Sequence, residues 1–327
     1  LAWDNLTYHG LKAGSWVQTG GWLLLDAPGA WEYYRSFFGG GEVYTAWAMM
    51  FLRSDALAAL PDLFFWLLMI LVVSSLGIQS GLKKTTAFAV AAAMVCNFDF
   101  NRWVNCSYVD TPATFFLLAA LFFAVHFLRY LRYVDACMVF AATGLGACIK
   151  INAMAASFII LIIFSVLAVK RISWGFTRYV ACVAMFAAPV VQWLAFNFEI
   201  TGYPLGCAPV KIGSLVLGSL PPNLEWFFNR PDLFPYSFHD ELIATLEALF
   251  FFGFSLVFPI FSLAGLTNAL RGNPAEFILK ISLIAATFAL FYSPAFSTIR
   301  LGWPDLNGRF IATAIVLLSI MGLHGLQ

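Results

Sequence analysis

The chain has 327 residues, of which 61% are hydrophobic and only 11% are charged, whereas charged residues make up about 25% of an ordinary soluble domain. The exterior of a soluble fold has to face water, so a domain of this length could not hide that much apolar surface. The composition therefore excludes a soluble domain and predicts an integral membrane protein. The net charge of +1 leaves no bulk basic field, so we expect no nucleic-acid partner.

Nine apolar segments follow one another along the chain, each bounded by charge, proline or glycine. We expect each to be helical, since lipid offers no hydrogen-bond partner to an open strand edge. The second and fourth are short for a bilayer core of about 30 Å, which needs roughly 20 residues. The predicted fold class is all-α, a polytopic transmembrane bundle. Its approximate segments are 62–80, 85–98, 111–128, 135–149, 152–169, 179–197, 247–268, 280–297 and 309–325.

The charges between these segments predict the orientation of the chain. One alternating set of connections holds nine lysines and arginines and only two acids: Lys83, Lys84, Arg129, Arg132, Lys170, Arg171, Arg178, Arg271 and Lys280, with Asp135 and Glu276. By the positive-inside rule this set is cytoplasmic. The outer side then holds residues 1–61, 99–110, a turn near Lys150, 198–246 and 298–308.

The first outer stretch, residues 1–61, is aromatic and amphipathic in pieces. We expect short helices lying at the membrane interface, where aromatic rings with polar edges settle. Nothing repeats at a fixed period and no low-complexity linker divides the chain, so residues 1–327 are expected to form one domain. Because Leu1 is followed at once by a polar, loop-like stretch, we expect that an N-terminal span is missing.

Two aspartates are candidates for chemistry in the predicted outer loops. Asp4 lies in residues 3–9, WDNLTYH, and can act as a general base if it is shielded from water. It also suits the N-cap of an amphipathic helix that runs to about Thr19. Asp110, in residues 108–112, YVDTP, precedes a long apolar span, and an N-cap role explains it fully. Both alternatives stay open on the sequence alone.

Two cations are candidates for binding an anionic group. Lys150 stands between two short apolar segments in residues 144–153, GLGACIKINA. A lone cation so close to the bilayer is costly and faces a cavity or a partner, such as a lipid-linked phosphate, or snorkels toward ordinary headgroups. Arg309, in residues 307–310, NGRF, can bind phosphate through two parallel hydrogen bonds. A salt bridge to Asp305 is the competing account.

Taken in chain order, these segments resemble the membrane-embedded glycosyltransferases of the GT-C type that use polyprenyl-phosphate sugars. They are most similar to the bacterial relatives of dolichyl-phosphate-mannose–protein mannosyltransferases and to the lipid A aminoarabinose transferase. The resemblance implies a catalytic role for Asp4. It implies substrate-binding roles for five further residues: His9, Glu42, Asp110, Lys150 and Arg309.

The chain departs from this family in its first loop. Many relatives have an adjacent Asp-Glu pair where this chain has Asp4 and Asn5, so no cofactor is certain and a divalent metal stays possible. The acid that relatives place late in that loop is Glu42 or Glu32, which spacing does not separate.

The resemblance implies an inverting sugar transfer on the outer face of a bacterial plasma membrane. Asp4 would take the proton of an acceptor hydroxyl, and Lys150 and Arg309 would stabilise charge on the departing phosphate. The expected partners are a polyprenyl-phosphate sugar donor, a lipid, glycan or protein acceptor, and membrane lipids. The alternative from another class is a solute transporter or lipid flippase, which would place ionisable residues deep within its spans.

Overall fold

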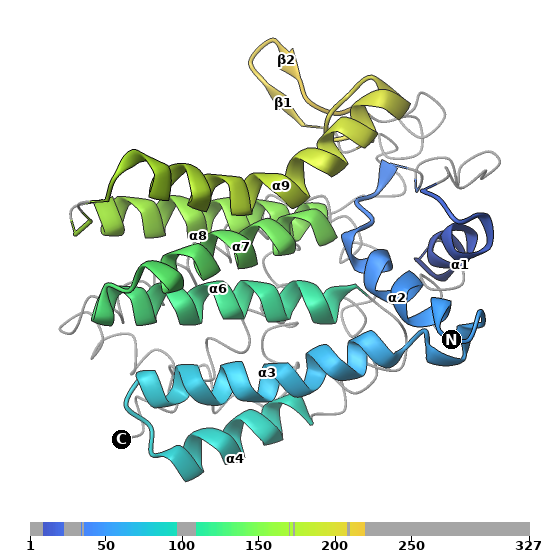
Figure 1. The fold of residues 1–327 in the computed structure, drawn as a ribbon. Coiled ribbons are helices and arrows are strands. Elements are labelled where there is room, and N and C mark those ends of the chain that lie inside the picture. The colour runs from blue at the N-terminus through green and yellow to red at the C-terminus, as the bar shows by residue number, and fades with distance from the viewer. Residues whose placement is uncertain are drawn as a thin grey trace, which may run out of the picture.

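The computed structural model of the chain describes residues 9–22, 34, 36–96, 109–169, 171–172, 174–207 and 210–219. Within these ranges the elements are helical, apart from one short antiparallel pair of strands (Figure 1). In chain order they are α1 (Gly10–Thr19), α2 (Gly40–Met50), the 3-10 helix η3 (Asp55–Leu57), α3 (Leu60–Gln79), α4 (Lys84–Val95), α6 (Asp110–Tyr130), α7 (Tyr133–Ile149), α8 (Ile151–Val169), α9 (Phe176–Thr201), β1 (Lys211–Ile212) and β2 (Leu215–Val216).

The first six predicted apolar segments are helices in the structure, namely α3, α4, α6, α7, α8 and α9. Three stretches are long and apolar enough to cross a membrane: Asp55–Gln79, Asp110–Tyr130 and Phe176–Thr201. Helices α4 and α7 have only 12 and 17 residues, as predicted for the second and fourth segments. The last three segments, from residue 247 onward, lie outside the described residues, so the total of nine spans stays a prediction.

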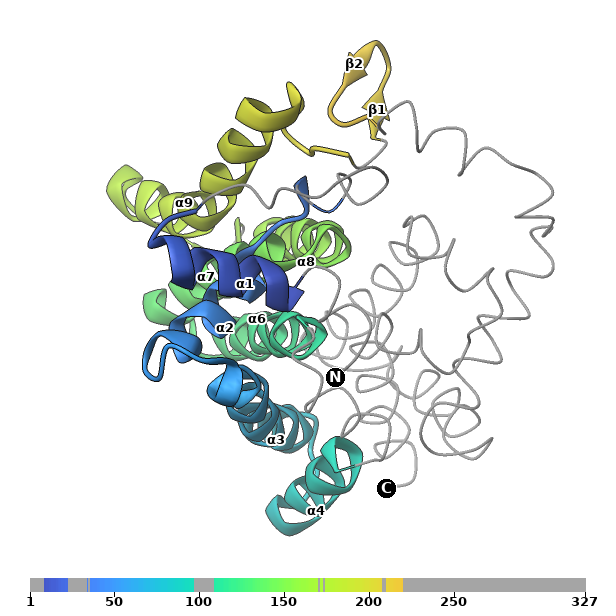
Figure 2. The same ribbon diagram turned by 90° about the vertical axis from the view of Figure 1, so that its right-hand side faces the viewer.

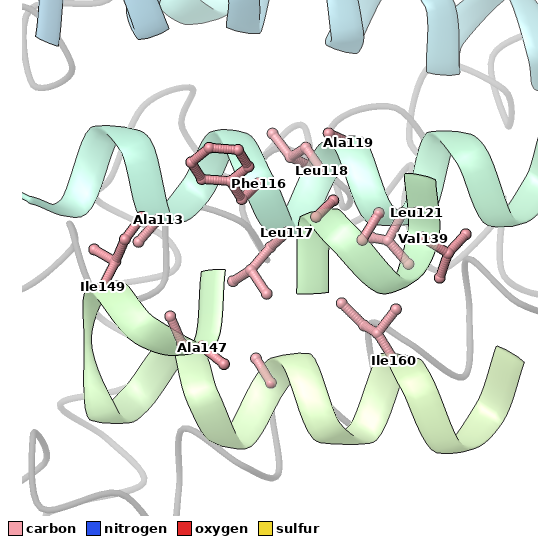
Figure 3. Packing of buried hydrophobic residues seen from close by; sticks show 14 of the residues in the cluster. Ala113, Phe116, Leu117, Leu118, Ala119, Leu121, Val139, Ala147, Ile149 and Ile160 are labelled. Atoms are coloured by element: carbon pink, nitrogen blue, oxygen red, sulfur yellow. The ribbon is translucent and has the colours of Figure 1, made fainter. Parts of the chain in front are cut away.

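Helix α6 lies at the centre of the described bundle, packed against α3, α7 and α8. Leu118, Leu121 and Phe127 are fully buried there, and Figure 3 shows side chains of α6, α7 and α8 meeting between the helices. On another flank α7 approaches α9 closely, because a Cβ atom added at Gly144 would lie 2.6 Å from the carbonyl oxygen of Phe186. Small residues at such crossings let membrane helices pack backbone to backbone.

Consecutive helices run in opposite directions, so the bundle has two distinct ends (Figure 1). At the first, named here the basic end, α3, α6 and α8 finish and α4, α7 and α9 begin. Arginines tie these termini together: Arg129 donates to the carbonyl oxygen of Gln79, and Arg171 Nη1 to that of Leu128 at 3.0 Å. The grouping predicted from the charge pattern is therefore present for those basic residues of the set that the structure describes, whereas Lys170, Arg271 and Lys280 lie outside the described residues. That the basic end faces the cytoplasm stays a prediction.

The opposite end, named here the site end, is where α6 begins at Asp110 and α7 finishes at Ile149. Helix α1 lies across this end rather than along the bundle (Figure 2), and it packs on α2. Both helices expose apolar side chains, including Leu11 on α1 and Trp47 and Met50 on α2. Short helices with exposed apolar residues at the ends of membrane spans fit the predicted interfacial position.

The packing of α7 on α9 is open to a direct chemical test. The sulfur atoms of Cys137 and Cys182 lie 3.8 Å apart, and both side chains are buried. We expect a membrane-permeant two-electron oxidant such as diamide to join them, because the sulfurs need approach only to the roughly 2.05 Å of a disulfide bond. Mass spectrometry of the digested protein should then show the Cys137–Cys182 peptide.

Cys148 provides the matched control for this cross-link. It is a buried thiol on the same helix, and it donates to the carbonyl oxygen of Leu145 at 3.1 Å. It should stay reduced under the same treatment. A disulfide that includes Cys148, or no disulfide at all, would contradict the arrangement of α7 and α9.

Candidate functional site

Four of the six residues that the sequence singles out lie at the site end. His9 immediately precedes α1, Glu42 is in the first turn of α2, Asp110 begins α6, and Lys150 joins α7 to α8. They are separated by up to about 140 positions in the sequence, and helix packing brings them to one end of the bundle. Asp4 and Arg309 lie outside the described residues, so their placement at this end stays a prediction.

Lys150 and Asp110 form an ion pair, with 2.8 Å between Lys150 Nζ and Asp110 Oδ1. Asp110 is buried, and the side chain of Lys150 is 19% exposed. The N-cap of α6 is Val109, without a side-chain capping bond. Asp110 therefore serves as the partner of a cation rather than as the N-cap, and Lys150 is held by a carboxylate at the helix ends. The position of Asp110 in the first turn of α6 also suits the helix dipole.

Two glycines let the start of α2 lie directly against the residues that precede Asp110 and Lys150. A Cβ atom added at Gly40 would lie 2.6 Å from the carbonyl oxygen of Cys148, and one at Gly41 would lie 2.2 Å from Val109. Any side chain there would push α2 away from the end of α7 and the start of α6. The close approach places Glu42, the next residue, near the residues that flank Asp110 and Lys150.

Glu42 is the centre of a second buried cluster. His9 Nδ1 donates to Glu42 Oε1 at 2.9 Å, and Lys12 Nζ lies 4.0 Å from the same oxygen. Lys12 also donates to the carbonyl oxygen of Phe37 at 2.8 Å. All three side chains are buried, and Glu42 is only 1% exposed. Glu42 Oε2 is also buried, and it has no hydrogen-bond partner among the described residues.

The neighbours of Glu42 keep it ionised despite its burial. Burial opposes the charged form, but attraction to His9 and Lys12 and the hydrogen bond from His9 outweigh it, so the pKa of Glu42 lies below its ordinary value. Burial lowers the pKa of Lys12, while attraction to Glu42 acts in the opposite direction. The cluster thus holds an ionised carboxylate, which accepts hydrogen bonds, in surroundings shielded from water. Electrostatic interactions are strong in such surroundings.

Replacing Glu42 by glutamine is expected to lower the free energy of unfolding at pH 7 by about 1–3 kcal/mol, because a buried charge-assisted hydrogen bond is weakened. The depressed pKa means that the ionised form contributes stability above the ordinary glutamate value, and that this contribution is lost as pH falls through the folded-state pKa. Wild-type protein should therefore lose stability below about pH 4.5 more steeply than Glu42→Gln. Thermal unfolding in detergent between pH 7 and 3 measures both effects.

The control for this comparison is Asp55→Asn in η3, because Asp55 is exposed. That variant should follow the wild-type curve at every pH. Equal acid sensitivity of wild type and Glu42→Gln would show that the ionised form of Glu42 is not favoured by the fold.

Sequence patterns do not single out two further charged residues of the site end, Lys12 and Asp62. Lys12 belongs to a short amphipathic helix and would ordinarily be assigned to the solvent-exposed face of that helix. Asp62 follows Pro61 in the first turn of α3, where an acid is expected as a complement to the helix dipole. Asp62 is nevertheless buried, its Oδ2 has no hydrogen-bond partner among the described residues, and it lies within electrostatic reach of Asp110. The signal that could have identified it is an ionisable residue inside a strongly apolar segment.

Binding of a metal ion would need several ligand side chains close together. Across the described ranges no three His, Cys, Asp or Glu side chains are grouped so that they could hold a metal ion. The two buried clusters instead pair each acid with a nearby cation or imidazole.

Comparison with known proteins gives one informative similarity. No protein-family model matches the sequence. No curated protein matches it either. The fold is similar to the crystal structure of ArnT from Cupriavidus metallidurans in the apo state, with a TM-score of 0.59 at 14% sequence identity. The match covers 97% of this chain and 54% of the ArnT chain, so this chain spans about half the length of that protein.

ArnT is an aminoarabinose transferase, a glycosyltransferase of the GT-C type. The resemblance to that group, recognised above on four short motifs, is thus confirmed for the fold. Together with the apolar helices, it identifies the chain as an integral membrane protein with an ArnT-like helical fold.

Proposed function

We propose that the chain is an inverting glycosyltransferase of the GT-C type, which moves a sugar from a polyprenyl-phosphate donor to an acceptor hydroxyl at the outer surface of the membrane. The observation that carries the proposal is the Lys150–Asp110 ion pair at the site end of an ArnT-like bundle. An ammonium held at the level of the helix ends matches the depth of a lipid headgroup, where the phosphate of such a donor would lie. The acceptor would be a lipid, a glycan or a protein.

The proposed reaction is a single displacement at the anomeric carbon of the sugar. The acceptor oxygen forms a bond to that carbon while the bond from carbon to the phosphate oxygen breaks with its electron pair. Asp4 takes the proton of the acceptor hydroxyl, and polyprenyl phosphate leaves as the anion. Lys150 and Arg309 stabilise the charge that develops on the phosphate oxygens.

The cluster around Glu42 supplies a second set of contacts in this scheme. The ionised carboxylate accepts hydrogen bonds, and Oε2 has none from the described residues. A sugar hydroxyl is the kind of donor that such an oxygen binds. His9 and Lys12 hold the other oxygen and fix the orientation of the carboxylate. We assign Glu42 and His9 to binding the sugar or the acceptor rather than to the proton transfer.

A transporter or flippase is the competing function, and the distribution of charges disfavours it. In the described helices α3, α4, α6, α7, α8 and α9, the lysines, arginines, aspartates and glutamates lie in the first or last turns. A transporter of this type would use ionisable residues and broken helices near the middle of the membrane. The buried charges of the described residues, apart from Asp135 at the basic end, gather at the site end, which fits a surface-active enzyme better.

Turnover with a labelled donor tests the proposed function. Membranes that contain the chain should transfer radiolabel from a polyprenyl-phosphate sugar to a product that extracts differently from the donor, whereas membranes without the chain should not. Counterflow of labelled lipid in sealed vesicles measures the competing activity. Counterflow of lipid without any transfer of sugar would contradict the proposed enzyme activity and support a transporter.

A further inference from the structure

Asp62 is a buried carboxyl that the proposed reaction does not use. It lies in the first turn of α3, which packs against α6, and it interacts electrostatically with Asp110. Asp110 is the partner of Lys150 at 2.8 Å. Three elements thus place two carboxyl groups and one ammonium at the same end of the bundle, with both carboxyl groups about nineteen-twentieths buried.

The charges of this trio determine what can bind there. Lys150 is already neutralised by Asp110, so an ionised Asp62 gives the trio a net negative charge. An arriving phosphate would add another negative charge in surroundings where water screens poorly, and the repulsion would be strong. If Asp62 instead carries a proton, the trio is neutral and the ammonium of Lys150 can attract the phosphate.

We infer that Asp62 is a positioning residue for the lipid phosphate, which binds at Lys150 only while Asp62 is protonated. The inference rests on the proposed function, because it concerns the donor that this function requires. The Oδ2 atom of Asp62 supports it, since this buried atom has no hydrogen-bond partner in the described part of the chain. Nothing there holds Asp62 permanently ionised, whereas Asp110 has Lys150 and Glu42 has His9.

The other groups around the first turn of α3 are compensated, neutral, exposed or at the opposite end of the bundle. Glu42 on α2 is compensated by His9 and Lys12. Burial, with a smaller contribution from Cys148, raises the pKa of Tyr44 on α2 to about 12, so Tyr44 stays neutral through pH 9. Helix α4 begins with Lys84 at the basic end. The charged residues of the connection before α3 are exposed, namely Arg53 and Asp55.

The experiment measures the affinity of the purified protein for undecaprenyl methyl phosphate between pH 5 and 9. This probe is a phosphodiester with one negative charge throughout that range, so any pH dependence belongs to the protein. Above the pKa of Asp62, wild-type affinity should fall by about tenfold for each pH unit, because each lipid that binds then has to take up one proton. Asp62→Asn should bind at every pH as tightly as wild type does at its acidic limit.

Asp55→Asn is the matched control, seven positions away on an exposed turn, and it should keep the wild-type pH dependence. Retention of that dependence in Asp62→Asn, or its absence from the wild type, would overturn the inference while leaving the proposed function intact. Failure of the wild type to bind the probe at any pH would count against the proposed function and the inference together.

A second measurement covers the case in which Asp62→Asn does not fold. Calorimetry of wild-type binding in buffers with different ionisation enthalpies reports the protons taken up with each lipid. Uptake should approach one proton per lipid at the alkaline side of the titration and vanish at the acidic side. Zero uptake across the whole range would refute the role of Asp62 without any variant.

Discussion

Lys150→Ala is expected to reduce sugar transfer by about 10²–10³-fold, the typical cost of losing one group that stabilises charge developing in the transition state. The ammonium lies at the site end, is held at 2.8 Å by Asp110, and is partly accessible. In the proposed reaction it meets the phosphate that departs from the sugar. The loss should appear in kcat/KM for the polyprenyl-phosphate donor, measured by initial rates in membranes.

This substitution also leaves Asp110 buried without its partner, which by itself can cost about 3–5 kcal/mol of stability. The double variant Lys150→Ala with Asp110→Asn removes the isolated charge. It should recover folding, as measured by thermal unfolding, and yet remain as slow as Lys150→Ala. Full recovery of transfer in the double variant would mean that Lys150 is needed only for stability.

Lys84→Ala supplies the control for a general loss of positive charge. Lys84 is exposed and begins α4 at the basic end, so its replacement should leave the donor dependence unchanged. An equal loss in Lys84→Ala and Lys150→Ala would remove Lys150 from the substrate site.

Asp4→Asn is expected to reduce transfer by about 10²–10⁴-fold, which is the usual contribution of a positioned general base. Asparagine keeps the size of the side chain and its hydrogen-bonding oxygen, but it cannot accept the proton of the acceptor hydroxyl. Membrane insertion and donor binding should be retained, so the loss should fall on kcat. Single-turnover measurements with bound labelled donor separate this effect from weaker binding.

The same variant distinguishes catalysis from a capping role for Asp4. An asparagine is as good an N-cap as an aspartate, so a residue that only caps a helix should tolerate the exchange. Wild-type turnover in Asp4→Asn would therefore exclude Asp4 as the base. Unaltered thermal unfolding together with lost turnover is the outcome that the proposed mechanism requires.

The inference on Asp62 gives the donor site a dependence on pH that differs from that of Asp4. A general base works when ionised, so loss of its proton raises the rate as pH increases. Protonation of Asp62 is instead required for the phosphate to bind, which weakens donor use as pH increases. The two effects fall on kcat and on donor affinity respectively, and Asp62→Asn should remove only the second.

Much of the architecture could be predicted from the sequence. Hydropathy and charge are local properties, and they were sufficient to predict the helices from α3 to α9 and the gathering of Arg129, Arg171 and Arg178 at one end. The shortness of α4 and α7 follows from the same count of apolar residues. The turn at Lys150 was also predicted, because a single charge interrupts two apolar segments.

The partners of individual residues could not be predicted in this way. The position of Asp110 before an apolar run indicates an N-cap, and only the packing of α6 on α7 shows that it meets Lys150, 40 positions away. The burial of Lys12 on an amphipathic helix and of Asp62 in a first turn could not be predicted either, since both patterns ordinarily indicate solvent-exposed residues. Whether such a charge is buried depends on which element covers it.

By itself, the sequence determined that this protein is a helical membrane protein with one group of basic residues at one end of the bundle, because these properties follow from composition and spacing along a single segment. The tertiary structure decided which charges meet. Gly40 and Gly41 allow α2 to close over the ends of α6 and α7, and this contact buries Glu42 beside His9. Such pairings depend on the relative heights and rotations of several helices, which no single segment specifies.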